Sequence, residues 1–239
     1  TIDSWIKSPS VKADATRHET VHIAALPSIV TNVLSPICSS LSAVYPTITY
    51  ELERTSRYNI ADLLADSEAS IGVLTDFSQN LPIHMKHLQN MNFVAEPIYE
   101  DYYVIYCNSA APFLSNPTEQ NCAQLVFNYY EDPLTQCLVE QLSQLLPSCK
   151  NISGHNYIVN DLLLTENVAN NPQAIGVIQK SKLRNPIIAN IFNSHNVSIL
   201  DESQYSIPVQ HYCIHRMDRF LSPGEQILIN NLKDKYQEY

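Results

Sequence analysis

The sequence predicts an α/β protein with two Rossmann-like lobes joined by crossing strands. Segments typical of strands alternate with segments of helical spacing in two separate parts of the chain, which is the pattern of sheets flanked by helices. Two extended segments, 98–107 and 207–215, are long enough to pass from one lobe into the other. The chain has 239 residues, 45% of them hydrophobic, which is enough to form the cores of two lobes.

The first alternation covers residues 21–74. Alternating apolar and polar residues favour strands, and apolar residues three and four apart favour helices. On these patterns we expect a buried strand at 21–26, a helix from 33 that ends before Pro46, a strand at 48–53, a short helix within 54–66 and a strand at 70–74. This βαβαβ order implies a parallel sheet with helices on its faces. The segment 79–95 is ambiguous.

The second alternation lies between the two long extended segments. Its pattern predicts strands at 125–128, 156–160, 174–178 and 197–200, and helices at 134–145, 161–170 and 180–193. A last helix follows, because Ser222 and Glu225 form a capping-box pattern with a proline at the first helical position. The predicted domains are a leader or linker remnant at 1–19, lobe I at 20–100 plus 208–239, and lobe II at 101–207.

Charge and composition narrow the classes of function. The formal charge is −10, the pI is about 5.1 and no run of Lys and Arg is present, so we do not expect this chain to bind DNA by itself. Six scattered cysteines without a CxxC pair indicate reduced thiols in a cytoplasmic protein. No apolar run reaches the about 20 residues that span a bilayer, and the polar start has neither a signal-peptide core nor an initiator Met. We therefore expect an excised or processed piece without membrane contact.

Five stretches, taken in order, resemble the effector-binding domain of LysR-type transcriptional regulators. Residues 22–56 and 60–74 are similar to the first strand and helix, the Tyr-Pro turn, the second strand and the following loop of that family. Residues 93–113 resemble its crossing strand. Residues 167–183 resemble its late helix–strand step, and 209–232 resemble its closing strand and helix.

The resemblance implies a function as well as a fold. The fold would be periplasmic-binding-protein type II-like, with two lobes that close on a small-molecule effector in the cleft between them and so control transcription. DNA would be bound only through an N-terminal winged helix-turn-helix that this chain lacks. A homodimer through lobe I is also implied, with a tetramer as an option for the full-length regulator. One departure is the turn NNPQAIG, which keeps only Gly176 of the family's usual Gly-x-Gly.

Candidate effector-binding residues follow the predicted strands, because ligands of open parallel sheets bind beyond the carboxyl ends of the strands. Ser28 and Thr31 come just after the first strand, where members of the family place hydroxyl groups on the effector. We also expect Ser28 to cap its helix. Thr55, Ser56 and Arg57 follow the second strand. A guanidinium beside two hydroxyls suits a carboxylate or phosphate, and a solvated loop arginine is the alternative.

The other candidates belong to the third strand and to lobe II. They are Thr75 and Asp76, and after the strands of lobe II, Asn128, Tyr129, Asn160 and Asp161. Asp161 is also a candidate helix cap. If its carboxylate faces the effector, it favours an amine or a hydroxyl over an anion. The charge of the effector therefore stays open at this point.

No pattern for catalysis or for a cofactor occurs in the sequence. GxSxG, a P-loop, HExxH and a Gly-rich dinucleotide turn are all missing, so we expect neither an enzyme nor a cofactor. His211, Cys213 and His215 share one face of a predicted strand, which a zinc ion could use. A fourth ligand is not evident, so packing is the preferred interpretation and no metal is expected.

Other functions remain open beside ligand sensing. An extracytoplasmic solute-binding protein would have the same two-lobe plan, and a signal peptide in the full gene would distinguish it. An effector-independent dimerisation domain would fill its cleft with its own side chains. The bulky residues Tyr58, Tyr129 and Tyr130 at the predicted cleft edge keep that alternative open. A third alternative is an enzyme on an α/β scaffold, which the lack of a catalytic sequence motif makes the least favoured.

Overall fold

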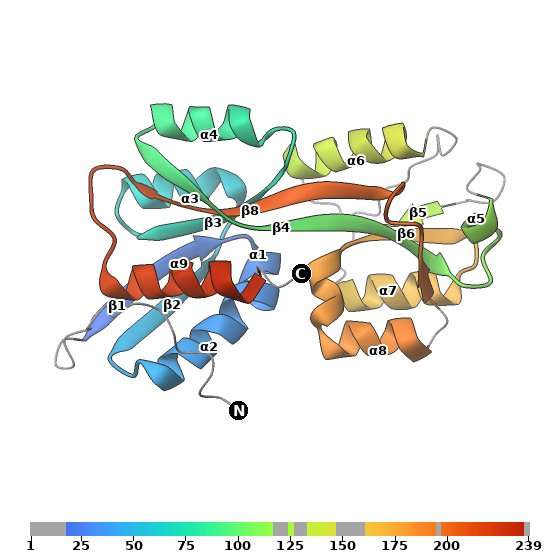
Figure 1. Ribbon diagram of the computed structural model, residues 1–239, viewed down its shortest axis with the longest axis horizontal. Coiled ribbons are helices and arrows are strands. Elements are labelled where there is room, and N and C mark those ends of the chain that lie inside the picture. The colour runs from blue at the N-terminus through green and yellow to red at the C-terminus, as the bar shows by residue number, and fades with distance from the viewer. Residues whose placement is uncertain (1–17, 117–123, 127–132, 147–160, 195–196, 237–239) are drawn as a thin grey trace. The chain divides into compact units, whose positions relative to one another are not determined.

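The computed structural model describes residues 18–116, 124–126, 133–146, 161–194 and 197–236 (Figure 1). Contacts between residues divide the chain into two units. Unit 1 comprises Thr1–Leu74, Lys86–Ile98 and Tyr212–Tyr239, and unit 2 comprises Thr75–Met85 and Tyr99–His211. The chain passes between the units inside helices and strands rather than in loops.

Parallel strands begin unit 1. Its elements are β1 (Glu19–Ala25), α1 (Pro27–Ile29), the π-helical turn η2 (Val30–Leu34), α2 (Ser35–Val44), β2 (Ile48–Arg54), α3 (Arg57–Ala65), the start of β3 (Ile71–Phe77), the end of α4 (Leu81–Asn90) and α9 (Pro223–Tyr236). Two long strands, β4 (Phe93–Asn108) and β8 (Ser206–Arg216), contribute to both units. β1 pairs in parallel with β2 over its whole length and also with β3, which confirms the predicted βαβαβ order.

The helical run after β1 supplies much of the core of unit 1. Val33, Leu34, Ile37 and Leu41 are buried, and α2 lies beside β2 and α9 (Figure 1). By length and composition alone, Pro27–Val44 would also suit a membrane span. Its apolar stripe packs on protein here, which is the ordinary arrangement of a core helix.

The start of α9 confirms the predicted capping box. The Ser222 backbone N–H donates to Glu225 Oε2 at 2.8 Å, and the Glu225 N–H donates to Ser222 Oγ at 3.3 Å. The Gly224 N–H donates to the carboxylate of Glu19 at 3.1 Å. The same turn that begins α9 is therefore fastened to the first residue of β1.

Unit 2 is built on the remaining parts of the long strands. Its further elements are α5 (Pro112–Ser115), β5 (Gln124–Val126), α6 (Pro133–Leu145), α7 (Asp161–Asn170), β6 (Ala174–Gln179), the 3-10 turn η4 (Lys180–Arg184), α8 (Pro186–Ser194) and β7 (Val197–Ile199). β6 runs antiparallel to β4 and parallel to β5. Ile105 and Cys107 of β4 face a cluster that includes α6, while Val104 and Tyr106 face α7 and α8. Helices thus cover both faces of this sheet.

Some predicted elements differ from the structure. The predicted helix 180–193 is two elements, because α8 begins at Pro186 and a proline restricts the residue before it to extended backbone. The ambiguous segment 79–95 contains α4 and the start of β4. The predicted strand 156–160 lies outside the described residues.

Candidate functional site

The turn after β1 places Ser28 and Thr31 at the carboxyl end of that strand. Leu26 has extended backbone, with φ −60° and ψ 145°, and is the N-cap of α1. No side-chain hydrogen bond caps this helix, so the prediction that Ser28 is the cap is wrong. The reason is Pro27, which takes the first helical position and leaves Ser28 one residue inside the helix.

Two features of this turn suit a ligand. The first N–H groups of a helix have no acceptor within the helix, so they are donors directed at whatever lies beyond its end. Ser28 is half-buried and Thr31 is exposed. Thr31 and Asn32 belong to the π-helical turn η2, and π-turns within helices occur frequently at functional sites.

The loop after β2 begins beside the last residue of β1. The Thr55 N–H donates to the Ala25 carbonyl at 3.0 Å, so the residues beyond β2 lie against the end of β1. Ser56 is the N-cap of α3, with φ −78° and ψ 157°, and makes no side-chain capping bond. Arg57 is the first residue of α3 and is half-buried. The five candidates of these two loops, Ser28, Thr31, Thr55, Ser56 and Arg57, therefore gather at one edge of the unit 1 sheet.

Thr75 and Asp76 lie within β3 rather than after it, and they belong to unit 2. Both are buried. Thr75 Oγ1 lies 2.8 Å from His211 Nδ1. Asp76 Oδ1 accepts the Phe77 N–H at 2.9 Å, and its Oδ2 pairs with His84 Nδ1. The polar atoms of both candidates are thus directed at other groups of the same unit.

Asp161 is the first residue of α7 and forms an ion pair. Lys182 Nζ lies 2.9 Å and 3.1 Å from its two carboxylate oxygens, and the side chains of Asp161 and Lys182 are 20% and 12% exposed. The negative charge of Asp161 is therefore compensated within unit 2. The other candidates of lobe II, Asn128, Tyr129 and Asn160, lie outside the described residues.

A buried polar network in unit 2 was missed by sequence reasoning. Asp101 Oδ1 accepts the N–H groups of Tyr102 and Ser181 at 2.8 Å and 3.1 Å, and its Oδ2 lies 3.5 Å from His211 Nε2. Burial by itself raises the pKa of the Asp101 carboxyl, but His211, Ser181 and Tyr102 together hold that pKa below its ordinary value. The signal in the sequence was a single aspartate within a largely apolar strand.

The alternating His211, Cys213 and His215 are buried in β8, which supports the packing interpretation. Nε2 of each histidine lies 3.5 Å from a carboxylate oxygen, that of Asp101 for His211 and that of Glu96 for His215. Among the described residues, no group of three or more His, Cys, Asp and Glu side chains could hold a metal ion.

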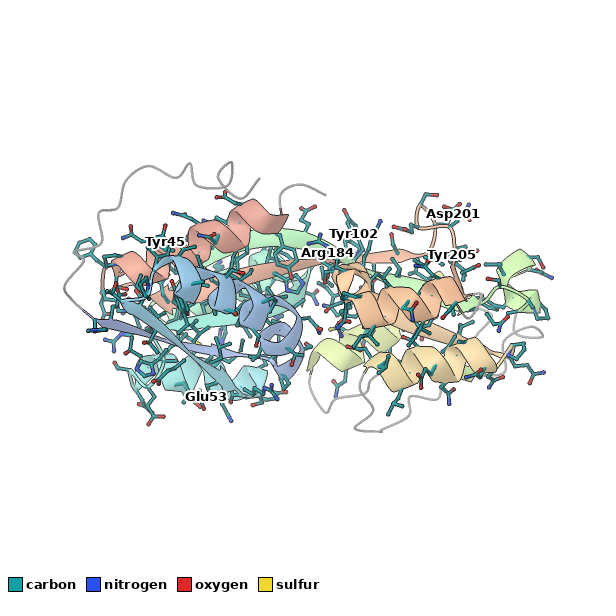
Figure 2. All side chains as sticks on the ribbon, turned by 90° about the horizontal axis from the view of Figure 1, so that it is seen from below. Tyr45, Glu53, Tyr102, Arg184, Asp201 and Tyr205 are labelled. Atoms are coloured by element: carbon teal, nitrogen blue, oxygen red, sulfur yellow. The ribbon has the colours of Figure 1, made fainter. Side chains whose placement is uncertain are left out.

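Unit 1 also has a pocket of about 470 Å³ beside the middle of β1 and the last four residues of β2. His22, Glu51, Glu53 and Glu68 contribute to its lining, and Glu53 is labelled in Figure 2. None of the predicted effector residues lines this pocket. Its charged side chains are exposed to water, so we place the candidate site at the loops after β1 and β2 instead.

Comparisons with solved structures identify the fold. The fold is similar to those of the regulatory domains of OxyR2, HypT and CcmR. A mutant of the OxyR2 regulatory domain from Vibrio vulnificus is 12% identical, with a TM-score of 0.67 and coverage of 95% of this chain and 99% of that one. The apo regulatory domain of HypT from Salmonella typhimurium is 16% identical, with a TM-score of 0.66 and coverage of 96% and 100%. The CcmR regulatory domain from Synechocystis in complex with 2-PG is 12% identical, with a TM-score of 0.63 and coverage of 92% and 99%.

The family follows from the sequence. The LysR substrate binding domain matches residues 14–237, and the chain belongs to this family. The match and the structural likeness confirm the predicted periplasmic-binding-protein type II-like fold. No curated protein matches the sequence significantly.

Proposed function

We propose that this chain is the ligand-sensing domain of a LysR-type transcriptional regulator and that unit 1 and unit 2 correspond to the predicted lobes I and II. The single observation that carries the proposal is the 3.0 Å hydrogen bond from the Thr55 N–H, directly after β2, to the carbonyl of Ala25, the last residue of β1. This contact brings hydroxyls, a helix amino end and a guanidinium to one edge of a sheet. Membership of the LysR substrate binding domain family supports the same function.

The charges favour an effector that carries a carboxylate or a phosphate. Asp161 is compensated by Lys182, and Asp76 is paired with His84. Arg57 brings a positive charge to the loop of Thr55 and Ser56, and the helix start after β1 adds N–H donors. The complex of the CcmR domain with 2-PG supports a small molecule as the kind of ligand to expect.

A thermal-shift screen followed by calorimetry tests this proposal. The screen should contain small carboxylates, phosphates and amines, because a ligand that binds only the folded domain must raise its unfolding temperature. For the compound found, we expect Ser28→Ala and Arg57→Ala to raise Kd about tenfold or more, which is a loss of about 1.4 kcal/mol. Arg54→Ala, the neighbouring exposed arginine, and Ser40→Ala on α2 are the matched controls. Full-strength binding by both site variants would show that the site is misplaced.

The family membership extends the proposal to partners and location. We infer a homodimer formed through unit 1 in the cytoplasm, with DNA bound by a winged helix-turn-helix domain of the whole regulator. Light scattering of the purified chain during size-exclusion chromatography tests the dimer, since it should give twice the mass of 27.0 kDa.

One observation favours a second candidate, an effector-independent assembly domain. The carboxylates of Asp76 and Asp161 and the hydroxyl of Thr75 already have partners within unit 2. If this candidate is correct, no compound in the screen will stabilise the chain, while the dimer will still form.

A further inference from the structure

Three strands and the helix α4 carry the chain between the units, and the junction residues of the three strands contact one another. The division falls between Leu74 and Thr75 in β3, between Ile98 and Tyr99 in β4, and between His211 and Tyr212 in β8. Thr75, Tyr99 and His211 are therefore the residues of unit 2 that lie directly at these three passages.

His211 is the residue that joins the other two. Its Nδ1 lies 2.8 Å from Thr75 Oγ1, and its ring stacks on that of Tyr99 with centroids 4.2 Å apart and planes at 18°. Gln210, its neighbour, donates from Nε2 to the Tyr99 carbonyl at 2.7 Å and to the His211 carbonyl at 2.9 Å. All four residues, Thr75, Tyr99, Gln210 and His211, are buried, so these contacts are shielded from water.

Asp101 determines which ring nitrogen of His211 carries the proton. Its Oδ1 is fixed by two backbone N–H groups, and its Oδ2 faces His211 Nε2 at 3.5 Å. A carboxylate on that side favours the tautomer with the proton on Nε2, which leaves Nδ1 to accept the hydroxyl proton of Thr75. The Thr75 hydroxyl therefore donates to His211 Nδ1, whereas His211 Nε2 and Asp101 Oδ2, 3.5 Å apart, are in electrostatic contact without a hydrogen bond. Together these contacts join side chains of β3, β8 and β4, and Asp101 Oδ1 adds the start of η4.

We propose that His211 is a positioning residue that fastens the three crossing strands at the hinge and so limits the movement of one unit against the other. The inference rests on the proposed function in one respect, because a sensor must change the balance between arrangements of its units when the effector binds. A buried hydrogen bond at the hinge restricts bending, since each strand can then bend only together with its neighbours. Loss of the bond weakens a buried contact and leaves the backbone ladder between β3, β8 and β4 to resist bending, so the strands should bend more easily.

The chain offers a matched control. His215 lies four residues further along β8, is also buried, and faces Glu96 at the same distance of 3.5 Å. It belongs wholly to unit 1, so His215→Phe removes a comparable buried imidazole without touching the junction. His211→Phe keeps an aromatic ring against Tyr99 and removes the ring nitrogens, with a somewhat larger ring in their place. Thr75→Val removes the hydroxyl at nearly constant shape, and Thr75→Ser restores it.

Pulsed electron paramagnetic resonance without any added ligand tests the hinge. Spin labels are attached through noncanonical amino acids at Ser39 of α2 and Asn167 of α7, two exposed positions, one in each unit. We expect His211→Phe and Thr75→Val to widen the distance distribution at least twofold, while His215→Phe and Thr75→Ser keep the wild-type width. Unchanged widths in the two hinge variants, or equal widening in His215→Phe, would overturn the inference. If His211→Phe does not fold, the comparison of Thr75→Val with Thr75→Ser decides.

The spin-label experiment and the thermal-shift screen can fail independently of each other. If the thermal-shift screen finds no stabilising compound but the widths differ as expected, the hinge assignment holds and ligand sensing fails. If a compound binds but the widths do not differ, ligand sensing stands and the role of His211 is wrong.

Discussion

Gly176 of β6 lies directly opposite Tyr106 of β4 in the antiparallel ladder, and the tyrosine ring occupies the space where a side chain would stand. A Cβ built on Gly176 would come within 2.6 Å of the Tyr106 hydroxyl oxygen. Tyr106 is 1% exposed and packs in the cluster with α7 and α8, so its ring has little room to move. This contact accounts for the one glycine that the turn NNPQAIG retains.

We therefore expect Gly176→Ala to destabilise the chain by about 1–3 kcal/mol, the usual cost of overpacking a core. Urea unfolding followed by circular dichroism measures the loss. Tyr106→Ala removes the obstacle, so adding Gly176→Ala to Tyr106→Ala should cost nothing further. If the two changes are simply additive, the contact is not the reason for the glycine.

The turn before α9 gives a second prediction, on helix capping. Ser222→Ala removes the oxygen that accepts the Glu225 N–H, and it also removes the hydroxyl that bonds Glu19. We expect a loss of about 0.5–2 kcal/mol in the free energy of unfolding, as for other cap residues. Thermal and urea unfolding should show it, with Ser222→Thr close to the wild type and Ser203→Ala, in an exposed turn, as the control. A Ser222→Ala variant as stable as the wild type would contradict the capping role.

Glu225 of the same box gives a prediction on pH. Burial raises the pKa of its carboxyl, but Arg219, at 2.8 Å and 3.0 Å, Ser222 and Ser70 lower it further, and the net pKa lies below the ordinary value. Because the pKa of the unfolded chain is about 4.3, ionised Glu225 stabilises the fold fully above that pH. The stabilisation is lost as the pH falls through the lower pKa of the folded state.

Glu225→Gln should therefore be less stable than the wild type at pH 7 and should lose less stability on acidification. Urea unfolding between pH 7 and pH 3 measures both effects. Glu140→Gln, an exposed change on α6, should follow the wild-type curve. Identical pH profiles for Glu225→Gln and the wild type would rule out this linkage.

Local patterns predicted the fold because the forces behind them are local. The alternation in 48–53 and the capping box at Ser222 each depend on neighbouring residues, and both are confirmed. The predictions at Ser28 and at 180–193 were wrong for a related reason, since Pro27 and Pro186 determine where each helix begins. The π-helical turn at Val30–Leu34 has no sequence pattern that would have indicated it.

The candidate site depends on partners far apart in the sequence, so less of it could be predicted. Strand order was enough to bring the loops after β1 and β2 together, because parallel neighbours end at the same edge. The pairing of Asp161 with Lys182 and the contact of Asp101 with His211 depend on tertiary packing, which no spacing reveals. The roles of Asn128, Tyr129 and Asn160 stay predictions.

The ion pair of Lys182 with Asp161 gives the last prediction, because the turn η4 carries an exposed pair beside it. Lys182 and Asp161 are mostly buried, whereas Lys180 and Glu202, 2.5 Å apart, are 50% and 42% exposed. Removing one partner of a mostly buried pair leaves a poorly solvated group without its partner, so Lys182→Met should cost about 1–3 kcal/mol. Lys180→Met should cost at most about 1 kcal/mol, since water solvates the remaining carboxylate. Urea unfolding of both variants and of the double variant Asp161→Asn/Lys182→Met measures the difference. The double variant should recover most of the loss in the free energy of unfolding, because it removes the uncompensated charge. If Lys182→Met and Lys180→Met lose equal stability, water solvates the carboxylate of Asp161, which could then face an effector.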